Sequence, residues 1–425
     1  MTDFLSSLSA IPLGKGGGIT SVCSAHPWVI EATLRHALKD DRPVLIEATC
    51  NQVNQFGGYT GMKPADFRAF VEAIAHDTGF PVARLILGGD HLGPNPWRDR
   101  PAEEAMRHAR DLVGAYVRAG FTKIHLDASM GCKGESAAVG DDLAASRAAE
   151  LAMAAEQAAD QENNSVRPLF VIGTEVPTPG GALEALDHVA PTSADAARLT
   201  YEAHAEAFRR LDLDDALSRV IALVVQPGVE FGDAAVLHFN PQAAAELSTA
   251  LGGMKGITFE AHSTDYQTLE ALAALVRNGF RILKVGPWLT FAMREALYGL
   301  DAIATELVLA RSQSLKHAME RLMVDEPDFW QRYYDGDATT LRIKRHYSLS
   351  DRIRYYWPHS RAQHAIDALL QDLGNSPLPM PLVGQYLGRI AHRFQGDETV
   401  LQPKPLIVSA IQDVLEIYSQ ACTKT

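Results

Sequence analysis

The chain has 425 residues, of which 47% are hydrophobic and 21% are charged, a balance typical of a soluble globular protein with a sizeable core. Its 39 lysines and arginines against 52 aspartates and glutamates give a net charge of −13, which argues against nucleic acid or a membrane as a partner because both need a positive face. Residues 1–10 do not read as a signal peptide, no apolar run is long enough to span a membrane, and the four cysteines form no C-x-x-C pair, so we expect a cytoplasmic protein.

Short apolar, β-branched runs alternate with long stretches of helical period, which is the pattern of successive strand–helix units. The strand-like runs are residues 19–25, 44–49, 85–89, 123–128, 169–175, 220–225, 256–261 and 281–286. The helical stretches are residues 27–38, 64–77, 102–119, 138–160, 194–211, 241–251, 268–278 and 290–309. Eight such units within about 310 residues predict an α/β fold of the (β/α)8 TIM barrel type. A doubly wound open sheet is the alternative, but the first unit lacks the G-x-G-x-x-G fingerprint of its dinucleotide-binding form.

The character of the sequence changes after residue 310. Strand-like runs become rare, aromatic and basic residues become denser, and amphipathic helical stretches follow at residues 360–373 and 383–394. We therefore predict two parts, a barrel over residues 1–310 and a helical C-terminal extension over residues 311–425 that packs on the barrel. The extension could cover one end of the barrel, form an interface in a homo-oligomer, or do both.

Most of the strand-like runs end in ionisable or amide side chains. Barrel enzymes place their working residues at the carboxyl ends of the strands, so these ends form the candidate active site. An unpaired charge within an apolar run would be costly. We therefore expect the carboxylates found there to be paired, hydrogen-bonded or metal-bound: Glu47, Asp127, Glu175 and Glu260. Each one singly could be structural, but the set together favours an active site.

The stretch Asp-His-Leu-Gly-Pro over residues 90–94 places a histidine beside an acid at the end of the third run. A lone histidine is more often structural, but His262 ends the seventh run and Glu175 the fifth. Two histidines and a carboxylate on converging strands are suitable ligands for zinc or another divalent metal. We therefore predict His91, Glu175 and His262 as metal ligands, with Asp90 beside them as a general acid or base.

The loop after the second run, residues 51–61, is rich in amides and glycine and poor in charge. Such a loop offers neutral hydrogen bonds to sugar hydroxyls and can close as a lid, although an ordinary flexible loop is the alternative. The substrate-binding residues predicted here are Asn51, Gln52, Asn54, Gln55 and Tyr59.

Phosphate sites in barrels often use the loops after the seventh and eighth strands. The hydroxyls of Ser263 and Thr264 and backbone N–H groups near Gly286 could hold a phosphate, and Lys284 or an arginine of the extension could supply charge. The glycine-rich segment of residues 14–18 does not match G-x-x-x-x-G-K-[ST] and precedes the first run. We interpret it as an entry loop, so the sequence offers no nucleotide site for a kinase.

Six motifs near the run ends occur in a specific order. They are S-x-H-P from Ser24, E-A-T-x-N-Q-V-N-Q-x-G-G-Y-T-G-M from Glu47, G-D-H-L-G-P from Gly89, D-x-S-M from Asp127, G-T-E-V-P from Gly173 and E-x-H-S-T-D-Y from Glu260. Together they resemble the Z-subunit family of D-tagatose-1,6-bisphosphate aldolase. The resemblance spans nearly the whole chain, including the helical extension.

The resemblance implies a class II aldolase-like barrel in the catabolism of galactitol and amino sugars. Members of that family have been described as non-catalytic partners of a separate aldolase subunit or labelled tagatose-6-phosphate kinases. Some relatives are epimerases that interconvert D-tagatose 6-phosphate and D-fructose 6-phosphate. The Asp-His pair and the later zinc-binding His of related aldolases match Asp90, His91 and His262. Those enzymes carry another zinc-binding His after strand six, where this chain has Gln226, so Glu175 is the expected third ligand.

The chemistry of the implied substrate favours an enzyme. C4 of a 2-ketose carries no acidic hydrogen, so its epimerisation requires cleavage and re-formation of the C3–C4 bond, with a metal-polarised carbonyl and a base for the C4 hydroxyl proton. The first hypothesis is therefore a ketose-phosphate 4-epimerase with Asp90 and Glu260 as catalytic carboxylates. The second is a non-catalytic subunit that stabilises a separate aldolase chain. A sugar-phosphate kinase ranks well below both.

Overall fold

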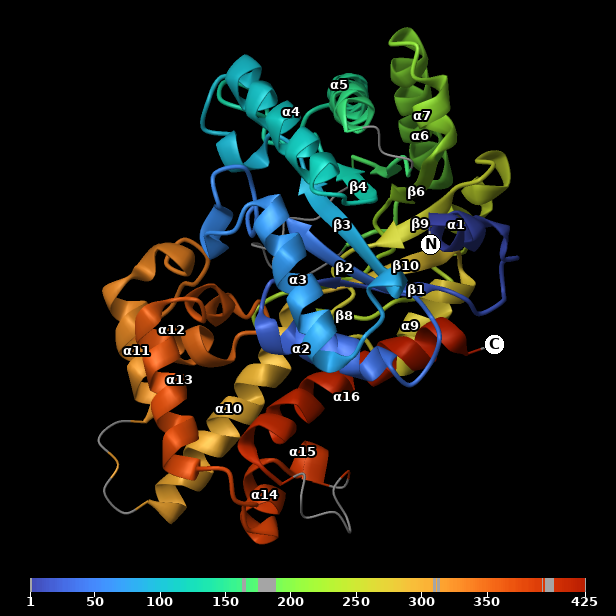
Figure 1. The fold of residues 1–425 in the computed structure, drawn as a ribbon. Helices are drawn as coiled ribbons and strands as arrows, with labels where there is room; N and C mark the ends of the chain where they lie inside the picture. Colours follow the sequence, from blue (N-terminus) through green and yellow to red (C-terminus); the bar gives the residue numbers. More distant parts are fainter. Residues whose placement is uncertain are drawn as a thin grey trace.

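The computed structural model describes residues 2–162, 166–174, 189–308, 311, 314–391, 393 and 401–424. Its centre is a closed barrel of parallel strands in the order β1-β10-β9-β6-β5-β4-β3-β2 (Figure 1). The strands are β1 (Ile19–Cys23), β2 (Val44–Thr49), β3 (Leu85–Leu92), β4 (Lys123–Leu126), β5 (Leu169–Ile172), β6 (Val220–Val224), β9 (Thr258–Ala261) and β10 (Phe280–Val285). The predicted (β/α)8 barrel is confirmed, since each strand-like run forms one strand.

Helices cover the outside of the barrel. They are α2 (Pro27–Ala37), α3 (Pro64–Thr78), α4 (Ala102–Arg118), α5 (Asp141–Gln161), α6 (Ala194–Arg210), α7 (Asp214–Ser218), α8 (Ala245–Thr249), α9 (Leu269–Arg277) and α10 (Pro287–Leu307). The helix predicted over residues 241–251 is shorter, because α8 passes into a 3-10 turn over Ala250–Gly253 that contains two glycines, which weaken helices. A small antiparallel pair, β7 (Glu230–Phe231) and β8 (Val236–Leu237), follows β6 and had no clear signal in the sequence.

β3 is longer than predicted and carries the Asp-His pair within it. Asp90 pairs in register with Thr49 of β2, so the strand continues past the apolar run. The pairing of β3 with β4 shifts between Gly89 and Leu92, and His91 has a φ of 51°. The strand therefore bulges at the predicted catalytic pair, a position where bulges often occur.

The amino-terminal end of the barrel is closed by a short helix that the sequence patterns did not predict. α1 (Thr2–Ser7) and the turn after it bring Leu5 and Leu8 into one buried apolar cluster with Ile19 and Ile86 of the barrel. The barrel interior is therefore apolar at this end. Toward the other end it holds fully or nearly fully buried charged side chains: Glu47, Lys123, Glu260 and Lys284.

The described part of residues 311–424 is helical. It contains α11 (Leu315–Asp325), α12 (Ala338–Tyr347), the 3-10 helix η7 (Arg352–Tyr356), α13 (Ser360–Leu373), α14 (Met380–Tyr386), α15 (Gly388–Ala391) and α16 (Pro403–Thr423). α16 packs against α2, α9 and α10, and Figure 1 shows it lying along the barrel while α11, α12 and α13 lie together on one side. A helical C-terminal region is thus present, whereas the division at residue 310 stays a prediction.

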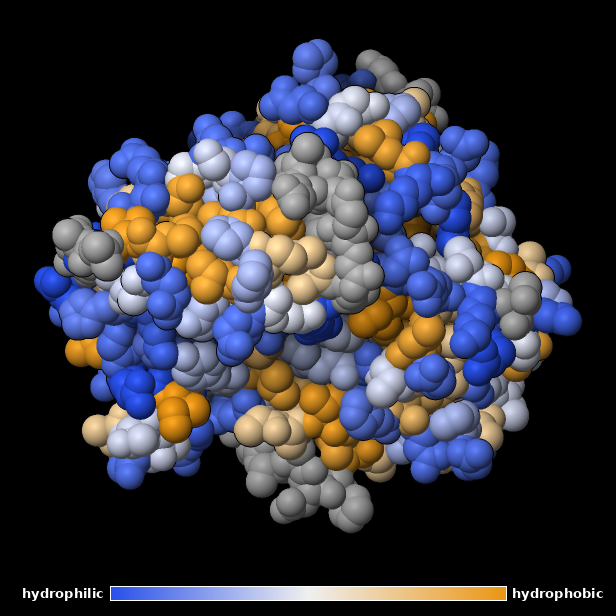
Figure 2. Space-filling model, turned by 90° about the horizontal axis from the view of Figure 1, so that it is seen from below, coloured by the Kyte–Doolittle hydropathy of each residue, from blue (hydrophilic) through white to orange (hydrophobic). Residues whose placement is uncertain are grey.

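The surface carries both hydrophilic and hydrophobic residues. No helix within the described ranges is both long and apolar enough to cross a bilayer. The face in Figure 2 carries hydrophobic residues in separate groups among hydrophilic ones. Several large hydrophobic side chains of the extension are exposed: Val324, Phe329, Tyr333, Ile343 and Tyr347. The predicted interface between copies of the chain stays a prediction.

Gly88 of β3 leaves the space that the Glu47 carboxylate occupies. A Cβ atom added at Gly88 would lie 2.6 Å from Oε1 of Glu47, and two lysines hold that carboxylate in place. We expect Gly88→Ala to lower the free energy of unfolding in urea by about 1–3 kcal/mol, the usual cost of overpacking a core. Gly252→Ala is the control, because a Cβ there meets nothing within 4 Å. Equal stability of the two variants would contradict the tight fit at Gly88.

Candidate active site

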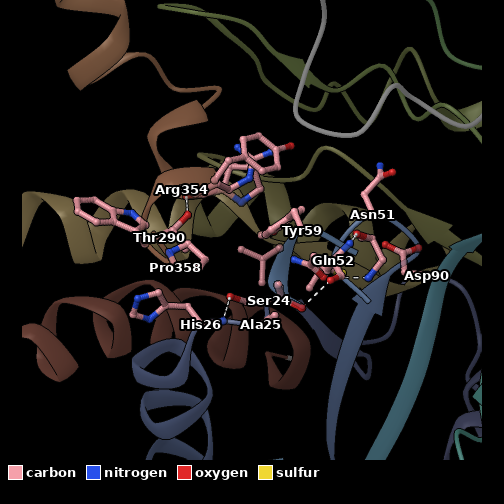
Figure 3. Close-up of a pocket in the computed structure, with 18 of the residues that line it drawn as sticks. Ser24, Ala25, His26, Asn51, Gln52, Tyr59, Asp90, Thr290, Arg354 and Pro358 are labelled. Carbon is pink, nitrogen blue, oxygen red and sulfur yellow. Dashed lines mark hydrogen bonds between the residues drawn. The ribbon is translucent and has the colours of Figure 1, made fainter. Parts of the chain in front are cut away.

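A cavity of about 290 Å³ lies at the carboxyl ends of the barrel strands (Figure 3). The barrel contributes Asp90, His91, His262 and Lys284, and the loop after β2 contributes Asn51, Gln52 and Tyr59. The C-terminal extension contributes Arg354, Tyr355 and Trp357. The cavity is therefore at the end of the barrel where the active site was predicted, and both parts of the chain build it.

Two lysines and three carboxylates form a buried network around the Asp90 side of this cavity. Nζ of Lys123 lies 2.5 Å from Oε1 of Glu47 and 2.7 Å from Oε2 of Glu260, and all three side chains are fully buried. Lys284 pairs with the other oxygen of Glu47 and lies 2.6 Å from Oδ1 of Asp90. Glu260, predicted to be catalytic, does not line the cavity. Its carboxylate is engaged by the lysines within the barrel and also offers a ligand atom to a possible metal site, so its catalytic assignment stays a prediction.

The network of buried ion pairs determines the protonation state of Asp90, the predicted general acid or base. Burial would raise the pKa of the Asp90 carboxyl, but His91 and Lys284 beside it outweigh burial and hold that pKa well below its usual range. Burial would lower the pKa of the Lys284 ammonium, yet Asp90 and the neighbouring acids raise it. Asp90 is therefore an ionised carboxylate at neutral pH, which is the form that accepts a proton.

Three histidine rings meet next to Asp90. The ring centroids of His91, His125 and His262 lie 5.1, 5.0 and 5.2 Å from one another. Each ring donates one N–H to a carboxylate: His91 to Asp127 (2.8 Å), His125 to Asp90 (3.0 Å) and His262 to Glu260 (2.9 Å). Histidine ligands of metals are usually held in this way, because the carboxylate fixes the tautomer and leaves the second ring nitrogen for the metal.

The surroundings of His125 fit a divalent cation. Its Nε2 atom is buried and has no hydrogen-bond partner within the described residues. The backbone N–H of His91 lies 3.3 Å from Nδ1 of His125, but the closer and ionised Asp90 favours the tautomer in which Nδ1 donates. Asp90, His125, Glu260 and His262 each offer one ligand atom, and these atoms all lie within 4.8 Å of one another.

The predicted ligands are brought together only in part. His262 belongs to this group of ligand atoms, and burial lowers the pKa of its ring to about 3, so the neutral ring can coordinate a metal. His91 is not in the group but lies beside it, with Nε2 3.7 Å from Oδ2 of Asp90. Glu175 lies outside the described residues.

His125 is the functional residue that sequence reasoning missed, because it lies inside a strand-like run and not after one. Lys123, His125 and Asp127 alternate along this strand, and side chains two residues apart point to the same face. This two-residue alternation predicts that the side chains of Lys123, His125 and Asp127 lie on the same face of the strand. Gln226 uses its side-chain oxygen to accept the N–H groups of Gly228 and Val229.

Two of the five residues predicted in the loop after β2 do not line the cavity. Asn54 donates to the carbonyl of Cys50 (3.0 Å) and accepts the N–H groups of Phe56 and Gly58. Gln55 donates to the carbonyl of His108 (3.0 Å). The side-chain groups of Asn54 and the amide N–H of Gln55 thus bond to the backbone, and the prediction that these two residues contact substrate stays a prediction.

The predicted phosphate loops reach the cavity with Ser263, Lys284 and Gly286. Thr264 does not line the cavity: it is fully buried and its hydroxyl donates to the carbonyl of Lys284, so its phosphate-binding role stays a prediction. The N–H of Gly286 donates to Oδ1 of Asp265 (3.1 Å). The backbone N–H group predicted to bind a phosphate is therefore already hydrogen-bonded to a carboxylate of the chain itself.

Unusual backbone conformations gather at this site. His91, Ser263 and Asp351 have φ values of 51°, 53° and 48°, which is uncommon for residues other than glycine. His91 and Ser263 line the cavity, and Asp351 directly precedes η7, which carries Arg354. Backbone strain of this kind is concentrated at functional sites in proteins.

Known proteins similar to this chain agree with the fold but carry different names. Residues 8–423 match a family described as D-tagatose-1,6-bisphosphate aldolase subunit GatZ/KbaZ-like. A relative from Agrobacterium fabrum named D-tagatose 6-phosphate 4-epimerase is 54% identical over 423 residues, which are 99% of each chain. The crystal structure of a probable tagatose 6 phosphate kinase from Sinorhizobium meliloti is 50% identical, has a TM-score of 0.88, and covers 95% of this chain and 100% of its own.

Lys123 neutralises carboxylates that water does not reach. We expect Lys123→Met to lower the free energy of unfolding by about 3–5 kcal/mol, because it leaves Glu47 and Glu260 without this counter-ion inside the barrel. Urea denaturation measures the change. Lys404→Met is the control, because the ion pair of Lys404 with Glu31 is exposed on the lysine side and such pairs contribute little. A cost for Lys123→Met no larger than that for the control would contradict the role of the network.

His125→Gln should weaken the binding of a divalent metal. We expect a loss in zinc affinity of at least about 10-fold, since even the outer partners of metal ligands contribute about 10–100-fold. The measurement is metal content by mass spectrometry after dialysis against buffered zinc. His204→Gln is the matched control, because His204 is also buried with an unpartnered Nε2 but bonds the carbonyl of Thr200 on α6. Equal metal content in both variants would exclude His125 as a ligand.

Proposed function

The chain belongs to the GatZ/KbaZ-like family of D-tagatose-1,6-bisphosphate aldolase subunits, and on this premise we propose that it is a ketose-phosphate 4-epimerase that interconverts D-tagatose 6-phosphate and D-fructose 6-phosphate. The observation that carries the proposal is the position of an ionised Asp90 beside His91, His262 and Lys284 in one cavity, with His125 hydrogen-bonded to Asp90. The name of the Agrobacterium relative supports the same reaction. The free cysteines and acidic charge fit a cytoplasmic enzyme.

The reaction sets three requirements. C4 of a 2-ketose lies β to the carbonyl, so its hydrogen is not acidic and direct proton removal cannot invert it. Inversion needs cleavage of the C3–C4 bond, rotation of the aldehyde fragment and renewed addition. The site must therefore hold a base for the C4 hydroxyl proton, polarise the C2 carbonyl and retain the aldehyde.

Asp90 is suited to the first requirement. Its Oδ1 atom is held by His125 and Lys284, which leaves Oδ2 for the C4 hydroxyl. Asp90 accepts that proton as the C3–C4 bond breaks and returns it when the bond forms again. Lys284 lines the cavity and stabilises the developing negative charge.

The histidines are suited to the second requirement. His125 and His262, which belong to the compact group of ligand atoms, would hold the metal with His91 beside them, and imidazole nitrogens suit zinc among other transition-metal ions. When bound, the cation polarises the substrate carbonyl. Glu260 touches no reacting atom in this scheme. It is a positioning residue, because it fixes His262 and lies 3.3 Å from Lys284.

The third requirement separates an epimerase from an aldolase, since the aldehyde must re-add before it leaves. The ring of Tyr59 in the β2 loop meets the ring of Tyr355 of the extension edge-on, with centroids 5.1 Å apart. This contact joins the two walls of the cavity. Asn51 and Gln52 line the same space and offer amide hydrogen bonds to sugar hydroxyls.

A non-catalytic subunit that stabilises a separate aldolase chain is the second candidate. It is favoured by the description of the family and by the exposed hydrophobic side chains of the extension. Neither the family description nor the exposed side chains support a sugar-phosphate kinase. The glycine-rich segment does not form a phosphate-binding loop, because the carbonyls of Lys15 and Gly17 accept hydrogen bonds from Arg281 and the segment precedes β1 rather than following a strand.

We expect the purified single chain to convert D-tagatose 6-phosphate to D-fructose 6-phosphate with added zinc or manganese and no ATP, as followed by NMR. Asp90→Asn should lower kcat by about 10²–10⁴-fold, the usual contribution of a general acid or base, with the fold intact by circular dichroism. Asp77→Asn, at a side chain that is 82% exposed, should retain full activity.

Either of two results would redirect the assignment. No conversion by the wild-type chain with any metal would favour the subunit hypothesis, and the next step would be co-purification with an aldolase chain. Conversion by the wild-type chain that Asp90→Asn leaves unchanged would keep the epimerase but remove Asp90 as its base.

A further inference from the structure

Arg354 is fixed over the cavity by its own segment of the extension. Its Nη1 atom donates to the carbonyls of Ser350 and Asp351, and its Nη2 atom donates to the hydroxyl of Tyr355 (2.8 Å). Its guanidinium carbon lies 4.4 Å from the centroid of the Tyr355 ring. These bonds use three of the five N–H donors of an arginine. The remaining donors include Nε, and the side chain lines the cavity.

Arg354 also lacks a close counter-ion. Among the residues that the structure describes, no carboxylate oxygen lies within 4.0 Å of its nitrogens. Lys284, the other cavity-lining side chain with a permanent positive charge, is paired with Asp90, Glu47 and Glu260. The segments outside the described residues contain no lysine or arginine. Asp351 and the cavity-lining Asp265 act on Arg354 electrostatically, but within the described residues neither forms a direct ion pair with it. A fixed guanidinium that lines a cavity and has no direct ion pair there is a binding group for an anion.

In this chain a carboxylate lies at the position where barrels often bind phosphate. Oδ1 of Asp265 accepts the N–H groups of Gly286 (3.1 Å) and Trp288 (2.8 Å) at the start of α10. This carboxylate caps the helix terminus where barrels often bind phosphate. An anionic group in the cavity must therefore find its charged donor elsewhere, and Arg354 is placed to provide it.

Arg354 and Asp90 both line the cavity, one from the extension and one from the barrel. Figure 3 shows the two residues on opposite sides of the drawn group, with Tyr59 and Gln52 between them. In a 2-ketose 6-phosphate only C5 lies between C4, at the bond that breaks, and the phosphate-bearing C6. A substrate with C4 at Asp90 and its C6 end toward the extension would therefore direct its phosphate to the side of the cavity that Arg354 lines.

We propose that Arg354 binds the terminal anionic group of the substrate, which is the 6-phosphate in the proposed reaction, and thereby selects ketose phosphates over neutral ketoses. This inference rests on the proposed function for the identity of the sugar. A guanidinium also binds the carboxylate of a hexuronate, so the experiment compares both anions with the neutral sugar.

The test is the affinity of the whole chain for D-tagatose 6-phosphate, D-tagaturonate and D-tagatose by isothermal titration calorimetry. We expect Arg354→Gln to weaken D-tagatose 6-phosphate about 10–100-fold, as for the loss of a hydrogen bond to a charged group, and to change D-tagatose less than about two-fold. Arg354→Lys keeps the charge and should retain part of the preference. A thermal melt by circular dichroism shows whether each variant is folded.

Arg352→Gln is the matched control. Arg352 lies on the same turn and also faces the Tyr355 ring, at 5.0 Å, but does not line the cavity. It should leave the ratio of the affinities unchanged. An equal loss for D-tagatose and its phosphate in Arg354→Gln would overturn the proposal, and so would an equal effect of Arg352→Gln. Tighter binding of D-tagaturonate than of D-tagatose 6-phosphate by the wild-type chain would overturn phosphate as the ligand.

The titrations use the chain without added metal and turnover is measured in a separate assay with metal, so the two proposals fail separately. A chain that binds ketose phosphates through Arg354 but converts none of them would contradict the epimerase and leave the anion site standing. A chain that epimerises D-tagatose 6-phosphate with unchanged affinity in Arg354→Gln would contradict only the anion site.

Discussion

The charge balance inside the barrel governs much of this structure. Glu47, Glu260 and Asp90 share Lys123 and Lys284, so three carboxylates meet two ammonium groups and leave one negative charge in excess. Isolated charges in such a place would be costly, and each lysine offsets that cost for two or more acids. The excess charge and the three neighbouring imidazoles together make the end of the barrel attractive to a cation.

The same network explains why Asp90 can act as a base in a buried position. A buried carboxyl ordinarily keeps its proton, but Lys284 and His91 hold the pKa of Asp90 well below its usual range. His125 and Lys284 also restrict the direction of the carboxylate. The bulge at His91 adds backbone strain at this point, which the surrounding ion pairs are able to hold.

Some residues of this site can be predicted from the sequence and others cannot, for physical reasons. The strands could be counted because each buried run is apolar and is bounded by helical periodicity, and Asp90, His91 and His262 stood out as polar residues at run ends. His125 and Lys123 do not stand out, because they lie within a strand-like run and not after it. Asn54 and Thr264 could not be separated from true cavity residues, since a polar side chain that faces the backbone and one that faces the substrate look alike in sequence. The pairing of Glu47 with Lys123 depends on closure of the barrel.

The extension belongs to the active site as much as the barrel does. The hydrogen bonds that attach it to the barrel include three close to η7: Tyr266 donates to the carbonyl of Leu349 (2.6 Å), Thr290 donates to the carboxylate of Asp351 (2.6 Å), and the backbone N–H of Leu349 donates to the carbonyl of Asp233 (2.8 Å). They hold Asp351 in its left-handed conformation and so fix the start of η7. Since Arg354 follows directly, the barrel loops determine where this arginine lies. The proposed chemistry therefore depends on residues from both sides of the predicted division at residue 310.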